Sequence, residues 1–328
     1  QVSITGNLTY GYQSTTTSDV KAGAFVVMPG GDTAGLGAET AAVQFTANED
    51  LGGGFAAKAS LKINTAPGGA ATTGDDHSLT LTTPVGGLVL GTAKSADYLS
   101  GGIAGVGAYY AGWDGTANKL FTTRTQRDYA AFVIPVGAMT FSVSQHEGAG
   151  EVLFGSGITG ATAAINGGSA APVTTLSATY SAGPLVANGQ YAVYKNSGAT
   201  NNAKDTTRLS ANYDLGMVKL GGGMVITNHT APAVAGANSP KTTDYMLAAK
   251  LPMGASSFGL TFASRTYADM IQGYSATGSG YSLEYGYAMS KRTSVIANYG
   301  RWTPVALMSA ATSVDASSQY QLLLSHSF

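Results

Sequence analysis

The sequence predicts an all-β fold, a transmembrane antiparallel β-barrel of 16 strands that occupies residues 1–328 as a single domain. Three observations predict this fold. Charged residues make up only 11% of the chain, whereas soluble domains carry about 25%. No run of about 20 consecutive apolar residues occurs, so we expect no membrane-spanning helix. Short segments of alternating apolar and polar residues are instead separated by turns rich in glycine and proline.

Composition also limits the possible functions. The chain contains no Cys, which excludes disulfides, thiolate metal sites and cysteine nucleophiles. Its net charge is -1 and it offers no basic patch, so we expect no nucleic-acid partner. Gln1 leads directly into a strand pattern, and we therefore expect a mature chain from which any export signal has been removed.

The first strands show the alternation clearly. Residues 2–12 place apolar side chains on one face and Ser, Thr and Asn on the other, and residues 13–37 read as a long loop. A second strand at residues 38–48 ends at the turn EDLGGG, residues 49–54. The strand at residues 55–63 then alternates again and carries Lys58 and Lys62 on its polar face.

The same unit of strand, tight turn, strand and longer connection recurs along the chain. The tight turns are EDLGGG at 49–54, PVGG at 84–87, PVGA at 135–138, SAGP at 181–184, DLGM at 214–217, PMGA at 252–255 and MSKR at 289–292. The longer connections lie near 14–37, 65–76, 95–125, 148–172, 197–205, 229–241, 269–279 and 303–315. Seven turns and eight long connections join 16 strands.

An even number of strands with short turns at one end and long loops at the other is typical of outer-membrane barrels. In such barrels the short turns face the periplasm and the long loops face outside, so we expect both termini to be periplasmic. A soluble meander and a β-helix are the alternatives, but a β-helix would show a short fixed repeat that this chain lacks.

The predicted faces favour a water-filled barrel. The outward faces include Phe141, Val143, Leu209, Tyr213, Tyr245, Leu247, Phe258, Leu260, Phe262, Leu283, Tyr285, Tyr287, Val295 and Tyr299. The matching inward faces carry Ser, Thr, Asn and charged residues. A ring of 16 strands is wide enough for an aqueous channel. A soluble barrel would show the reverse, with apolar residues inside.

The last segment, SQYQLLLSHSF at residues 318–328, is a strand of this kind. One face carries Tyr320, Leu322, Leu324, His326 and Phe328, and the other is mostly polar. A strand of about 10 residues with an aromatic residue at each end of its apolar face fits a bilayer crossing with aromatic girdles.

Several of these segments resemble a known family. EDLGGGFAAKASLKI, PVGGLVLGTA, ANYDLGMVKLGGGM, LPMGASSFGLTFASR, YSLEYGYAMSKRTSVIANYGR and the closing LLLSHSF are similar in order and spacing to general porins of Gram-negative outer membranes, especially those of β-proteobacteria. The resemblance implies a homotrimer in outer-membrane lipid and lipopolysaccharide, with passive diffusion of ions and small hydrophilic solutes. It also implies that the third long loop folds into the pore and that the terminal aromatic strand is an assembly signal.

The resemblance places the pore-narrowing loop at about residues 95–125. Its candidate constriction residues are Asp97, Tyr109, Tyr110, Trp113, Asp114, Lys119, Arg124 and the adjacent Arg127. The candidate pore-wall residues are Lys58, Lys62, Lys94, Arg208, Asp244, Arg265 and Glu284. At positions where porins usually carry wall arginines, this chain has Ala42, Thr92, Ser325 and Ser327. We therefore expect a weaker transverse field, and an excess of inward cations over carboxylates predicts a mild anion preference.

Two alternatives remain open. The loop aromatics Tyr109, Tyr110, Trp113 and Phe121 either pack the loop against the wall or form a stacking surface for sugars or aromatic solutes, as in a substrate-specific porin. An outer-membrane enzyme barrel needs Ser or Asp beside His, and His146 follows the inward Ser142 and Ser144. The histidines show no metal-ligand spacing. The sequence thus predicts a general diffusion porin with no cofactor and no catalytic activity.

Overall fold

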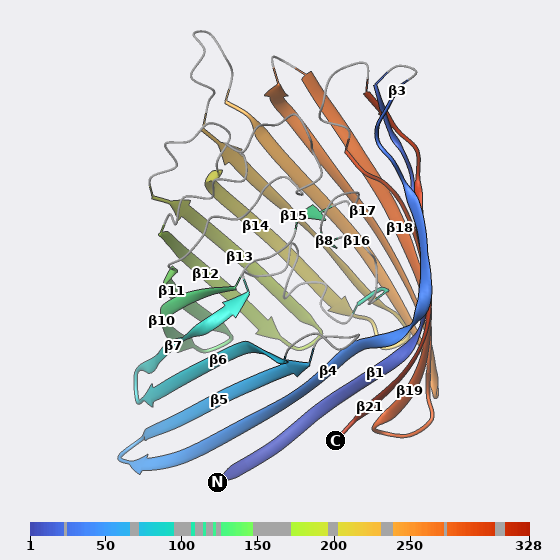
Figure 1. Cartoon of the computed structure of the whole chain (residues 1–328). Helices are drawn as coiled ribbons and strands as arrows, with labels where there is room; N and C mark the ends of the chain where they lie inside the picture. The colour runs from blue at the N-terminus through green and yellow to red at the C-terminus, as the bar shows by residue number, and fades with distance from the viewer. Residues whose placement is uncertain are drawn as a thin grey trace.

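The computed structural model describes residues 1–22, 25–65, 72–94, 106–108, 114–115, 121–122, 126–146, 172–195, 203–230, 239–271, 274–305 and 312–328. These residues form a closed antiparallel barrel of 16 strands (Figure 1), as the sequence predicted. The barrel strands are β1 (Val2–Thr17), β4 (Gly31–Gly52), β5 (Phe55–Thr65), β6 (Thr72–Thr83), β7 (Gly86–Lys94), β10 (Gln126–Val136), β11 (Met139–His146), β12 (Val173–Ala182), β13 (Leu185–Tyr194), β14 (Ala203–Asp214), β15 (Lys219–His229), β16 (Lys241–Met253), β17 (Ser256–Ile271), β18 (Tyr274–Ala288), β19 (Thr293–Thr303) and β21 (Ser317–Ser327).

Each barrel strand pairs with its neighbours in chain order, and β21 closes the ring against β1. Two small sheets lie within the long connections. β2 (Val20–Ala22), β3 (Phe25–Met28) and β20 (Thr312–Val314) form one of them, so the first and last long connections are joined. β8 (Asp114–Gly115) and β9 (Phe121–Thr122) pair in parallel within the third connection. No helix among the described residues is long and apolar enough to cross a membrane.

The seven short turns lie together at one end of the barrel, as predicted. Gly137, Gly183 and Gly254 each close a turn with a positive φ, of 59°, 54° and 62° respectively. Residues with a Cβ rarely adopt this backbone conformation, so glycine is the natural residue at these positions. Both chain termini lie at the same end (Figure 1), where the amino group of Gln1 donates to the Asn48 carbonyl at 2.7 Å.

Two predicted loops were wrong. Residues 13–37 were expected to be a loop, but β1 continues to Thr17 and β4 begins at Gly31, with these two residues paired. Residues 269–279 were expected to be a loop, but β17 continues to Ile271 and β18 begins at Tyr274. Both stretches are rich in Gly, Ser and Thr, which locally favour turns, but ladder pairing with a neighbouring strand satisfies their backbone groups.

The exposed and buried faces confirm the predicted inversion of a soluble protein. Outward side chains such as Leu247 and Leu322 are 63% and 56% exposed. Inward side chains such as Thr206, Ser282 and Gln321 are buried although they are polar. An apolar outer belt around a polar interior is stable only where the surroundings are lipid outside and water inside.

The closing strand presents its predicted face to the outside, with Tyr320, Leu322, Leu324, His326 and Phe328 exposed. Phe328 and Gly6 exchange both backbone hydrogen bonds, at 3.0 and 2.9 Å. A Cβ on Gly6 would lie 2.3 Å from the Phe328 ring, so the ring lies directly over this glycine. The terminal aromatic residue is therefore part of the seam between the first and last strands.

Candidate pore constriction

The third long connection, which joins β7 to β10, enters the barrel. Its described part includes Val106–Ala108 and the β8–β9 pair, and Figure 1 shows β8 within the outline of the barrel. Val106 and Gly107 are buried. The segment contacts β16 and β17, and β17 lies eight positions from β7 in the ring of 16 strands. The connection therefore leaves one wall and reaches the opposite wall, as expected for a loop folded into the pore.

Two glycines allow this contact. Gly107 has a φ of +85°, and a Cβ there would lie 2.3 Å from Thr261 Oγ1 and 2.8 Å from Ala248 Cβ. A Cβ on Gly259 would lie 2.4 Å from the Gly107 carbonyl oxygen. The Ala108 N–H donates a hydrogen bond to Thr261 Oγ1 at 2.9 Å. Backbone thus lies directly on backbone, and any side chain at either glycine would separate the two surfaces.

On the same two strands, β16 and β17, the predicted wall residues Asp244 and Arg265 form a buried ion pair. Nε and Nη2 of Arg265 donate to the two carboxylate oxygens of Asp244, both at 2.6 Å, and Nη1 donates to the Tyr267 hydroxyl at 3.2 Å. Asp244 is 1% exposed and Arg265 is 3% exposed. This bidentate geometry is the strongest arrangement of an arginine–carboxylate pair. The two charges largely cancel in the pore.

The other predicted wall carboxylate, Glu284, is also close to a cation. Its Oε1 lies 3.8 Å from Lys250 Nζ on the inner face of β16. Both acidic wall residues that the sequence proposed are therefore neutralised locally, Asp244 by Arg265 and Glu284 by Lys250. Neither leaves a strong negative field on this side of the lumen.

The remaining predicted wall cations lie on other strands. Lys58 and Lys62 are on the inward face of β5, and Arg208 is on the inward face of β14. Arg127 begins the inward face of β10; it is 4% exposed, and its Nε and Nη2 have no hydrogen-bond partner among the residues that the structure describes. For Lys94 the structure gives only its backbone pairing with Gln126, so its place on the pore wall stays a sequence prediction.

Most of the predicted constriction residues fall outside the described part of the chain. These are Asp97, Tyr109, Tyr110, Trp113, Lys119 and Arg124. For Asp114 and Phe121 the structure gives only their backbone pairing in the β8–β9 sheet. The choice between a packing role and a stacking role for the loop aromatics thus stays a sequence prediction.

The serine and histidine proposed for an enzyme barrel do meet. Ser144 Oγ lies 2.9 Å from His146 Nε2, and the His146 ring stacks on Tyr129 at a centroid distance of 5.4 Å. Both residues lie on β11, which pairs with β10 and β12 along its whole length. Its backbone N–H groups are engaged in these ladders and are not placed to stabilise an oxyanion. Within the described ranges no group of three His, Asp or Glu side chains could hold a metal ion.

The sequence missed the docking segment itself. The sequence marked only the whole connection near 95–125, whereas the structure holds Gly107 and Ala108 against the far wall. A run of small residues in the middle of the longest connection was a weak signal of close approach to backbone. Nothing in the sequence linked Gly107 to Gly259, which lies on a distant strand.

Comparison with known proteins agrees with this geometry. The profile of the family described as Gram-negative porin matches residues 1–303. Among solved structures, the trimer form of OmpT, an outer membrane protein of Vibrio cholerae, has a TM-score of 0.64 at 13% identity and covers 100% of this chain and 99% of its own. A Rh. blastica porin mutant has a TM-score of 0.61 at 12% identity, with 100% of both chains covered. A porin refined at 1.8 Å has a TM-score of 0.55 at 13% identity. No curated protein matches the sequence significantly.

Proposed function

This chain belongs to the Gram-negative porin family, and from that premise we propose that it is a general diffusion channel for ions and small hydrophilic solutes. The contact of Gly107 and Ala108 with the wall opposite β7 is the observation that supports this reading most directly. A loop that reaches the opposite wall narrows a wide barrel without filling it, which limits passage by solute size. We propose no catalytic role for the Ser144–His146 pair.

We further propose a mild anion preference. The described wall carboxylates Asp244 and Glu284 are each neutralised by a neighbouring cation, whereas Lys58 and Arg127 have no carboxylate partner within the described ranges. Arg127 is the more important of the two, because its guanidinium is buried beside the start of the inward loop, where screening by salt is weakest.

Planar-bilayer recording tests both parts of the proposal. The wild-type protein should form open channels, and a KCl gradient should give a reversal potential on the anion-selective side. Arg127→Met should move that potential towards zero, because it removes the charge but keeps much of the side-chain volume. The matched control is Arg301→Met, which removes an exposed arginine from the outer face of β19. Absence of conductance would refute the channel, and cation selectivity of the wild type would refute only the anion preference.

For the assembly we propose a homotrimer in which short turns and both termini face the periplasm. The trimeric form of the Vibrio cholerae protein supports the oligomer, and the usual polarity of bacterial barrels supports the orientation. Lys241 and Arg301 are exposed on the outer face at the long-loop end. We propose that they contact phosphate groups of lipopolysaccharide, while the apolar belt contacts outer-membrane lipid. The outward face of β21 is the proposed assembly signal.

A further inference from the structure

The outer wall of the barrel has an apolar groove that runs across β16, β17, β18 and β19. Its volume is about 550 Å³. Large side chains form its sides and alanines line it on the first and last of these strands, and these residues are Phe258, Leu260, Leu283, Tyr285, Ala249 and Ala297. The four large side chains are between 38% and 48% exposed. Leu247 and Leu322 beside the groove are exposed as well, so the groove is continuous with the lipid-facing belt.

The groove follows from the cross-strand register. Leu260 pairs with Leu283, and Phe258 pairs with Tyr285, so two rows of large outward side chains cross β17 and β18. Successive outward residues of one strand are about 7 Å apart, which leaves a gap between the rows. Gly259 lies in this gap and has no side chain to fill it. The groove is therefore a consequence of residue size in two neighbouring rows.

The length of the groove suits a single hydrocarbon chain. Ala249 on β16 and Ala297 on β19 lie three strand intervals apart, and neighbouring strands are about 4.8 Å apart, so the groove is about 15 Å long. The hydrocarbon core of a bilayer is about 30 Å thick, so the acyl chains of one leaflet span a similar length. Barrel strands are tilted by about 35–45°, so a chain that lies across them still runs obliquely into the membrane.

Two hydroxyl groups mark a polar boundary at the short-turn end of the groove. Ser256 begins β17 directly after a short turn, and its Oγ lies 3.1 Å from the Tyr285 hydroxyl. Leu260 follows Ser256 by four residues, about 13 Å along the strand, and the strand tilt makes its depth in the membrane smaller. The apolar belt of a bacterial barrel is about 25 Å tall, so the groove occupies the half nearer the short turns.

The groove lies directly behind the contact of the inward loop. Gly259 lines the groove from outside, and a Cβ on the same residue would lie 2.4 Å from the Gly107 carbonyl oxygen. Because Gly259 has no side chain, a single layer of backbone separates the groove from the loop. A chain bound in the groove would therefore lie against the strand on which the loop rests.

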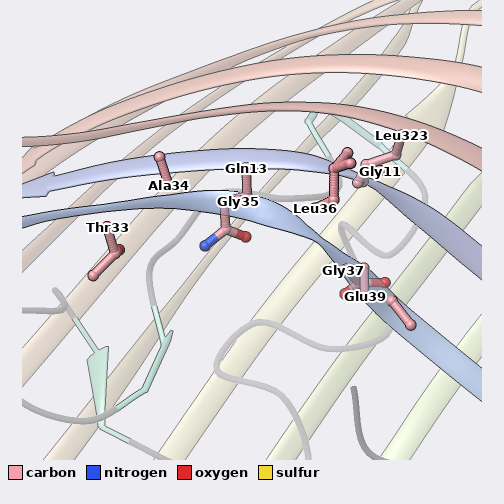
Figure 2. A pocket seen from close by; sticks show the side chains of 10 residues that line it. Gly11, Gln13, Thr33, Ala34, Gly35, Leu36, Gly37, Glu39 and Leu323 are labelled. Atoms are coloured by element: carbon pink, nitrogen blue, oxygen red, sulfur yellow. The ribbon is translucent and has the colours of Figure 1, made fainter. Parts of the chain in front are cut away.

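A second hollow, between β1, β4 and β21, has a different chemistry (Figure 2). Its volume is about 280 Å³, and its lining includes the polar side chains of Gln13, Thr33 and Glu39. Amide, hydroxyl and carboxylate groups lose free energy in contact with hydrocarbon unless they are hydrogen-bonded. An acyl chain therefore suits the groove on β16–β19 and not this hollow.

We propose that the groove on β16–β19 holds one acyl chain of a phospholipid, with the polar part of the lipid near Ser256 and Tyr285. The inference rests on the proposed function for the orientation of the barrel, which places this half of the belt in the periplasmic leaflet. That leaflet of an outer membrane consists of phospholipid, whereas lipopolysaccharide lies in the other leaflet. The bound chain is a specific site within the general lipid contact of the belt, and it lies behind the loop contact.

The test titrates purified full-length protein in detergent with palmitoyl-oleoyl phosphatidylethanolamine and counts bound lipid by native mass spectrometry. The wild type should bind one lipid per chain saturably. Ala297→Leu fills one end of the groove and should lower the lipid affinity about tenfold, the change expected when two methylene groups lose their contact. Ala249→Leu fills the other end and should act alike, so the test does not depend on the folding of one variant. The matched control is Ala211→Leu, the same change on the outward face of β14, which should bind as the wild type does.

Several results would overturn the inference. Wild-type protein that binds no lipid saturably has no such site, and equal affinities of Ala297→Leu and Ala211→Leu place the lipid elsewhere. Tighter binding of lipid A than of phosphatidylethanolamine would refute the choice of lipid. Binding that appears only after the oligomer is dissociated would show that a second copy of the chain covers the groove. Lipid binding is measured without conductance, so a protein that conducts in bilayers but binds no lipid refutes only this inference, and one that binds lipid without conducting refutes only the channel.

Discussion

Replacing Gly259 with alanine is expected to displace the inward loop from the far wall. The added Cβ would lie 2.4 Å from the Gly107 carbonyl oxygen, 2.6 Å from the Gly107 carbonyl carbon and 2.9 Å from the Ala108 nitrogen. All three are backbone atoms, so no side-chain rotation relieves the clash. Favourable non-bonded separations are about 3.5–4.0 Å, so the loop must retreat by about 1 Å.

That retreat would break the hydrogen bond from Ala108 N–H to Thr261 Oγ1, which is now 2.9 Å long. A net loss of about 0.5–1.5 kcal/mol shifts the ratio of docked to undocked loop by roughly 2- to 13-fold. Thr261→Val removes the acceptor without adding bulk, so it should act in the same direction but more weakly.

Single-channel recording measures the effect. Gly259→Ala should change the unit conductance and raise the open-channel noise, because a loop released from the wall samples more positions in the lumen. Gly189→Ala is the matched control, since its Cβ would meet only the Leu209 side chain, at an ordinary 3.5 Å. If Gly259→Ala folds normally by circular dichroism but keeps wild-type conductance and noise, the docking does not hold the loop in place.

Two other variants test the wall and the seam. Asp244→Leu leaves Arg265 buried without its carboxylate, so the free energy of unfolding should fall by about 3–5 kcal/mol and the midpoint of unfolding in guanidinium chloride should drop. The double variant Asp244→Leu/Arg265→Met should recover most of that loss. A wild-type unfolding midpoint for Asp244→Leu would contradict the structural role of the pair. Phe328→Ala removes the ring that lies over Gly6 and should lower the yield of folded barrel in cell envelopes. Leu247→Ala, a control substitution at another lipid-facing position, should not lower this yield. Equal yields of the two variants would argue against the carboxy-terminal strand as an assembly signal.

Local sequence rules predicted most of the barrel. Alternation of period two assigned faces such as that of Tyr320 to Phe328 correctly, because a strand in a barrel wall must put lipid and water on opposite sides. Glycine-containing turns predicted the short connections correctly, because a tight turn depends on the residues within it. The rules failed at residues 13–37, where the pairing of β1 with β4 overrides the turn preference of Thr and Gly.

Less of the candidate constriction could be predicted from the sequence. Asp244 and Arg265 could be assigned to the inward face, but their pairing depends on the register of β16 against β17. Arg127 was proposed as a constriction residue by resemblance, yet its burial and its unpartnered nitrogens come only from the folded chain.

The sequence by itself therefore determined the two faces of each strand, the positions of the short turns and the number of strands. These properties follow from residue type and spacing within short segments. It determined the barrel, the number of strands and the family. Only the tertiary structure decided what meets across the lumen, where Gly107 rests on Gly259. That contact joins residues more than a hundred positions apart, and its reason is steric: two backbones approach closely only where both lack a side chain.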